Sequence, residues 1–132
     1  MLPITWDTVR IFIHVIAATV WVGGQLTLAA LVPGLRSVAP EAPRVVARRF
    51  NQVAWIAYGI LIVTGLWNIA AVDPVWDSDY GHTLMIKIGL VALSGLTALL
   101  HSLASTRRGL AVWGAASGLS ALAVVFFAVQ LR

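Results

Sequence analysis

The stretch from Ile11 to Val32 is almost entirely apolar and contains a single imidazole, His14, near its start. A helix of that length rises about 1.5 Å per residue, which is enough to cross the roughly 30 Å hydrocarbon core of a bilayer. A helix also satisfies its own backbone hydrogen bonds, as the bilayer requires. His14 would lie about 5 Å below one membrane face, where an ionisable side chain costs free energy unless it contacts protein, water or a metal. The stretch therefore predicts a membrane helix that carries a functional histidine.

The composition supports a membrane protein. Of the 132 residues, 60% are hydrophobic and only 11% are charged, which excludes an ordinary soluble domain. A net charge of +4 would suit nucleic acid in a soluble chain, but here it indicates topology signals and lipid headgroup contacts. We therefore expect membrane lipid, and no nucleic acid, as a partner. The sequence has no cysteine, which excludes thiolate metal sites and iron–sulfur clusters.

Four apolar spans are expected along a single transmembrane domain, residues 1–132. They cover about residues 11–33, 50–72, 83–105 and 110–130. Pro33-Gly34 is predicted to end the first span, and the basic connector Leu35–Arg49 is predicted to begin irregularly. Asp73-Pro74 closes the second span, and Arg107–Gly109 is expected to make a tight turn. Such short connections predict an all-α fold, an integral membrane antiparallel four-helix bundle with both termini on one side.

The arginines indicate which side faces the cytoplasm. Six of them lie in the first and third connectors, at positions 36, 44, 48, 49, 107 and 108. The positive-inside rule places these connectors in the cytoplasm and both termini outside it. The first apolar run is too long for the hydrophobic region of a cleavable signal peptide, so we expect that helix to be retained.

Counting residues from the span ends predicts which polar side chains share a depth. His14 lies about 5 Å from the outer face, and Lys87 lies at a similar depth, about 6 Å into the third span. Thr64 and Asn68, four residues apart, belong to the same outer half. The expected outer-half constellation is His14, Asn68, His82, Met85 and Lys87. Several polar groups at one level of a membrane protein favour a functional site.

Each member of the constellation also has a structural interpretation. His14 could bond a carbonyl or hydroxyl group of a neighbouring helix. Lys87 could extend to the outer headgroups or pair with Asp79. His82 could be an interfacial residue, and Met85 could fill the core.

Trp21 and His101 lie outside the constellation. Trp21 follows His14 by seven residues and therefore shares its helical face, near mid-membrane. His101 lies about 27 Å from Thr83 along the third span, so it cannot share a metal centre with His14. We expect it to be an interfacial residue beside Ser102, with a proton relay or inner gate as the alternatives.

Small residues predict close helix packing. Gly114 and Gly118 form a GxxxG pair in the fourth span, and Gly89, Ala92 and Gly95 form a strip in the third. The GxxxG pair could serve packing within the bundle or a homodimer contact.

Three motifs carry a family resemblance. They are H-x6-W-x-G-G from His14 to Gly24, VTGLW from Val63 to Trp67, and YGHTLMIKIGL from Tyr80 to Leu90. Together they resemble the copper resistance protein D (CopD) family of bacterial membrane proteins. That resemblance implies copper handling at the bacterial cytoplasmic membrane, often beside a periplasmic copper-binding partner.

The chain also resembles, more distantly, the HemJ-type protoporphyrinogen oxidases, which are small four-span haem proteins. That likeness implies haem b, with His14 as the axial ligand and Lys87 as the functional lysine. The sequence departs from the pattern after the first span, where only VPGLR stands in place of an arginine-rich segment and no second histidine follows. For a cofactor of this kind, the expected binding residues are His14, Lys87, Asn68 and Trp21.

These features predict a copper-binding or copper-transporting membrane protein with no assigned catalytic residue. The expected metal ligands are His14, His82 and Met85, with Lys87 in the same outer half. A haem b redox protein is the alternative, and only that alternative implies an oxidoreductase. A structural accessory subunit of a membrane complex is the third.

Overall fold

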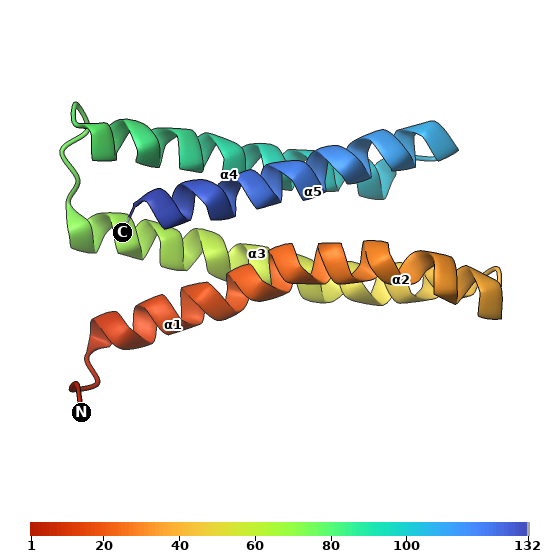
Figure 1. The fold of residues 1–132 in the computed structure, drawn as a ribbon, viewed down its shortest axis with the longest axis horizontal. Coiled ribbons are helices and arrows are strands. Elements are labelled where there is room, and N and C mark those ends of the chain that lie inside the picture. The colour runs from red at the N-terminus through yellow and green to blue at the C-terminus, as the bar shows by residue number, and fades with distance from the viewer. Residues whose placement is uncertain (132) are drawn as a thin grey trace. The chain divides into compact units, whose positions relative to one another are not determined.

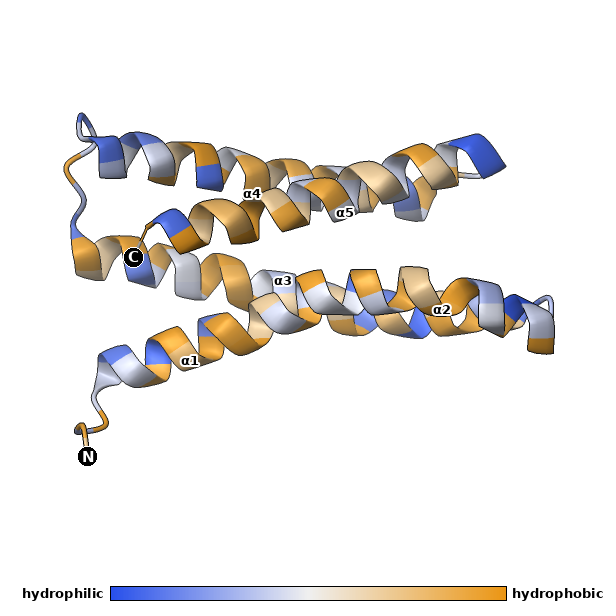
Figure 2. Ribbon diagram, viewed as in Figure 1, coloured by the Kyte–Doolittle hydropathy of each residue, from blue (hydrophilic) through white to orange (hydrophobic). Residues whose placement is uncertain are grey.

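The computed structural model describes residues 1–131, and within them the chain is helical apart from short connections. In chain order the elements are α1 (Trp6–Ala18), the π-helical turn η1 (Thr19–Gly23), α2 (Gly24–Val38), α3 (Ala42–Val72), α4 (Asp79–Leu103) and α5 (Arg107–Gln130) (Figure 1). Four continuous helices of the described chain are long and apolar enough to cross a membrane: Trp6–Val38, Ala42–Val72, Asp79–Leu103 and Arg107–Gln130. Apolar residues cover most of each helix (Figure 2). The predicted all-α, multi-pass membrane fold is confirmed.

The helices form two compact units, one from Met1 to Asp73 and the other from Pro74 onward. In the first unit, α1, η1 and α2 make one continuous helix that packs antiparallel against α3. In the second unit, α4 packs against α5. Each unit is therefore an antiparallel helical hairpin, consistent with the predicted bundle.

The first helix runs past Pro33-Gly34, so the prediction that this pair ends it is wrong. Pro33 lies inside α2, which continues to Val38. Proline removes one backbone hydrogen bond, and membrane helices tolerate that loss. The helix ends at Ala39, whose extended backbone (φ −153°, ψ 132°) is the conformation that the following Pro40 imposes on its predecessor.

The connectors are shorter than predicted. Only residues 39–41 separate α2 from α3, because Pro43 lies in the first turn of α3, where no hydrogen bond from its nitrogen is needed. Arg107–Gly109 forms the first turn of α5 rather than a loop, since the Thr106 side chain accepts a hydrogen bond from Gly109 N at 3.0 Å and caps that helix. Asp73, in a left-handed conformation (φ 48°), ends α3 as predicted.

Small polar residues fill the contact between α4 and α5. The buried residues there are Ser94, Gly95 and Thr97 of α4 and Ser117, Ser120 and Ala121 of α5. Ser117 Oγ donates to Ser94 O at 3.4 Å across the hairpin, while Thr97 and Ser120 bond carbonyls of their own helices. Close approach therefore depends mainly on serine and threonine. Of the predicted strip, only Gly95 is buried, and Gly89 is exposed.

Gly81 is a close-approach position at the start of α4. Its nitrogen donates to the Ser78 cap, and an added Cβ would overlap the carbonyl oxygens of Val75 and Trp76. We expect Gly81→Ala to lower the free energy of unfolding by about 1–3 kcal/mol, because backbone must move to make room. Gly89→Ala is the matched control, since nothing lies within 4 Å of its added Cβ. Thermal unfolding in detergent, followed by circular dichroism, should separate the two variants; equal melting temperatures would contradict this close packing at Gly81.

Candidate functional site

His14 and Thr64 lie in contact at one level of the first hairpin. His14 Nδ1 is 2.7 Å from Thr64 Oγ1, and Thr64 is buried in the C-terminal third of α3. Thr64 Oγ1 is also 2.7 Å from the carbonyl oxygen of Ile60, one turn earlier. A carbonyl oxygen only accepts, so the single hydroxyl proton of Thr64 is donated to Ile60. The proton between His14 and Thr64 therefore belongs to His14 Nδ1.

This hydrogen-bond chain sets the tautomer of a neutral His14. With the proton on Nδ1, the lone pair of the imidazole is on Nε2, the atom that can coordinate a metal. Metal-binding histidines usually donate their other ring nitrogen to a protein acceptor in this way. The ring also lies close to Gly65, where an added Cβ would be 3.6 Å from His14 Cε1. The bond to Thr64 also agrees with the alternative that His14 only joins two helices. That purely structural role, however, would not require a particular tautomer.

Trp21 belongs to an aromatic cluster deeper in the same hairpin. It is buried in η1, with its ring centroid 5.6 Å from that of Trp55 and 4.5 Å from that of Tyr58 on α3. The wide turn of η1 is followed by Gly24, where an added Cβ would overlap the ring of Phe50. Trp21 therefore packs α1 and α2 against α3, two turns C-terminal to His14. Asn68, half-buried on α3, lies one turn from Thr64 toward the C-terminal end of that helix.

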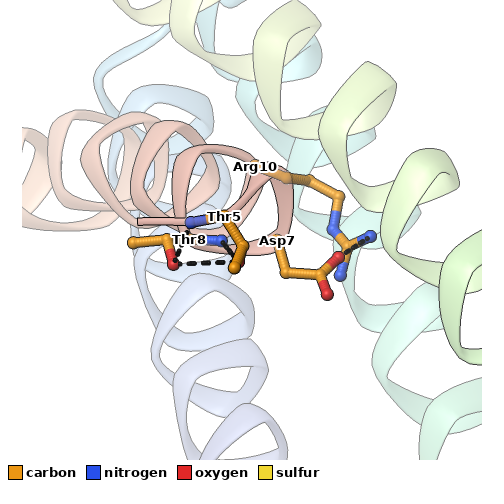
Figure 3. Close-up of polar contacts among 4 residues, drawn as sticks. All are labelled: Thr5, Asp7, Thr8 and Arg10. Carbon is orange, nitrogen blue, oxygen red and sulfur yellow. Dashed lines mark hydrogen bonds and ion pairs between the residues drawn. The ribbon is translucent and has the colours of Figure 1, made fainter. Parts of the chain in front are cut away.

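Arg10 is a candidate site residue that the sequence analysis did not identify. It is just 6% exposed, and its Nη1 is 3.0 Å from Asp7 Oδ1 (Figure 3). Arg10 precedes His14 by one turn on the face that also carries the buried Ala17 and Trp21. This face contacts α3, so Arg10 lies one turn from the imidazole toward the N-terminal end of α1.

One donor of Arg10 has no acceptor. Its Nε is buried without a hydrogen-bond partner, and it alone among the described residues is a buried side-chain nitrogen or oxygen in that state. Leaving such a group unpaired costs about 1–3 kcal/mol, more when it is charged. The sequence feature that could have identified Arg10 was its spacing of four residues from His14, which puts both side chains on one helical face. Thr5 and Thr8, which cap α1 reciprocally, fix the helix start beside the Asp7–Arg10 pair (Figure 3).

The remaining predicted residues lie on α4. His82 and Met85 are three residues apart and exposed on one side of the helix, whereas Lys87 is half-buried. Two residues correspond to about 200° of rotation, so Lys87 faces away from Met85. His101, near the C-terminal end of α4, donates from Nδ1 to the carbonyl oxygen of Leu110 at 2.9 Å. Within residues 1–131, no three His, Asp or Glu side chains gather as a metal cluster.

Comparisons with known proteins give a consistent family assignment. Residues 44–131 match the family described as copper resistance protein D. The chain is 30% identical over 105 residues to the copper transport protein CutJ of Bacillus subtilis, covering 74% of this chain but only 19% of CutJ. It is 29% identical over 136 residues to an uncharacterized protein of Aquifex aeolicus, covering 92% of both chains. No solved structure matches.

Gly114 makes room for His101, and this can be tested. An alanine Cβ at position 114 would lie 3.1 Å from ring atoms of His101, so the imidazole must shift and its bond to Leu110 must lengthen. Gly118→Ala is the matched control, because nothing lies within 4 Å of an added Cβ there. We expect the Nδ1–H resonance of His101, measured by NMR in micelles, to move in Gly114→Ala only. Identical resonances in both variants would show that Gly114 has no such role.

Proposed function

Since the chain belongs to the copper resistance protein D family, we propose that it takes copper as cargo at the outer half of the bacterial cytoplasmic membrane. The observation that carries the proposal is the hydrogen-bond chain from His14 through Thr64 to Ile60, which puts the imidazole lone pair on Nε2. An oriented neutral imidazole is a suitable ligand for copper in either oxidation state. The name of CutJ, a copper transport protein, agrees with this chemistry.

We propose His82 and Met85 as the other ligands. Their support is the shared side of α4, the affinity of imidazole and thioether for copper, and the residue count that puts both in the outer half. Asn68 and Lys87 would line the same level. Lys87 would lie on the opposite side of α4 from Met85. There it would pair with an anionic group rather than bind copper.

The proposed setting follows from the charges. The short basic connectors would face the cytoplasm and both termini would lie outside it, so that the copper site opens toward a periplasmic copper-binding partner. The four spans would act as one transmembrane domain in lipid. If a second copy docks through the GxxxG pair, Gly118 would provide the contact, because the space beside its Cα is open.

Haem b is the second candidate, and two features of the first hairpin favour it. The same Nε2 lone pair suits an axial ligand, and the cation Arg10 lies one turn outward, where a carboxylate of the macrocycle could be held. His14 would hold the iron, with Lys87, Asn68 and Trp21 beside the macrocycle. Bound haem would supply electron-transfer chemistry, and the protein would set its orientation.

Replacing His14 tests the copper site. We expect His14→Ala to abolish stoichiometric copper binding by the detergent-purified protein and to change cellular copper accumulation. His101→Ala is the matched control, because that histidine lies at the other end of its span and should leave the outer site intact. Metal analysis with an absorption spectrum distinguishes the candidates: a Soret band lost in His14→Ala would favour haem. Full copper binding by His14→Ala would refute the proposal, and an unchanged phenotype would favour a structural accessory subunit.

Replacing Thr64 tests how the imidazole is oriented. Thr64→Val keeps the shape but removes the acceptor for His14 Nδ1–H, and we expect copper affinity to fall about 10–100-fold. Thr64→Ser retains the hydroxyl and should bind copper nearly as well as the wild type. Titration against a competing chelator provides the measurement. Equal affinities for valine and serine variants would exclude an orienting role for Thr64.

A further inference from the structure

The guanidinium of Arg10 has one buried donor without a partner, Nε. Asp7 contacts Nη1, whereas the edge formed by Nε and Nη2 is the one that pairs side-on with carboxylates or phosphates. Nε on that edge is buried and has no acceptor. Asp7 itself is largely exposed, with 71% of its side chain accessible, and it pairs with Nη1, so it leaves the buried Nε without an acceptor. The arrangement suits a carboxylate or phosphate oxygen that reaches Nε on the face of α1 that packs against α3.

Arg10 also lies where a bare copper ion would meet repulsion. Residues four apart on a helix have Cβ atoms about 6 Å apart, so a cation bound at His14 Nε2 would share one face of α1 with Arg10, one turn away. Two positive charges at such a distance repel, and the low dielectric of the membrane strengthens the effect. A carboxylate that belongs to the metal complex would turn this repulsion into attraction.

We propose that the metal reaches His14 as a complex with a carboxylate-bearing ligand, and that this carboxylate accepts hydrogen bonds from the Nε edge of Arg10. The inference rests on the proposed function and adds the chemical class of the cargo, which is a metal complex rather than the bare ion. His14 Nε2 forms a coordinate bond in place of one ligand of the incoming complex, such as water, which leaves. The oxidation state of the metal does not change, and no proton is transferred.

The test compares two copper complexes on the full chain in maltoside detergent. Copper(II) glycinate carries carboxylates, and copper(II) ethylenediamine is a matched complex without them. We expect Arg10→Gln to weaken glycinate-complex binding about tenfold or more, and to leave ethylenediamine-complex binding unchanged or stronger. Because each variant is compared with wild type for the same complex, differences between the chelators cancel. Equal effects on both complexes, or none on either, would overturn the inference.

Two more variants distinguish the Nε edge of Arg10 from its ion pair and from the metal ligand. Asp7→Asn keeps the Nε edge and should preserve the response to glycinate. Loss of the glycinate response in Asp7→Asn would assign the effect to the Asp7–Arg10 ion pair. His14→Ala should lose both complexes, and retention of both would refute the proposed function independently of Arg10. Melting temperatures with and without each complex give a readout of binding that needs no transport.

The source of the carboxylate and the role of lipid are tested in parallel. Haem b and its dimethyl ester differ only in their propionates, so a Soret band that Arg10→Gln weakens for haem alone would identify the carboxylate as a haem propionate. A copper-glycinate response with no haem binding would identify a copper chelate. If the glycinate response vanishes in phosphatidylcholine nanodiscs, a headgroup phosphate occupies Arg10 and the inference is wrong.

Discussion

The one hydroxyl proton of Thr64 is the constraint on which the candidate site in the first hairpin depends. Because that proton is donated to Ile60 O, Thr64 can only accept from His14 Nδ1, and the imidazole lone pair is placed on Nε2. The aromatic cluster of Trp21 and Tyr58 holds η1 against α3, two turns along the helix from this bond. The metal chemistry proposed for this family member therefore depends on a neutral contact between two helices.

The sequence was sufficient for the membrane fold and for part of the site. Hydropathy located all four spans, and counting residues put His14 and Thr64 in the same half of the membrane, and the two side chains make contact. The end of the first helix was misplaced because Pro33 was treated as a stop, whereas the restriction that Pro40 places on Ala39 is the stronger one. The tautomer of His14 could not be predicted, since it depends on which acceptor receives the Thr64 proton.

Arg10 and Gly114 show why residue type alone assigns the wrong role. An arginine near the end of a span is expected to reach the headgroups, but Arg10 is buried and its Nε has no partner, because it lies on the α3-facing side of α1. Gly114, which reads as half of a dimer motif, instead accommodates the His101 ring within its own hairpin. In both cases the deciding factor is what faces the residue across the hairpin.

The division of the chain at Asp73 has a consequence for biogenesis. The His14–Thr64 bond, the Asp7–Arg10 pair and the aromatic cluster all lie within the first 73 residues. Synthesis proceeds from the N-terminus, so this hairpin can pack while the second is still on the ribosome. The buried arginine then enters the bilayer with its countercharge three residues away, and the costliest charge in the first span needs no help from later segments.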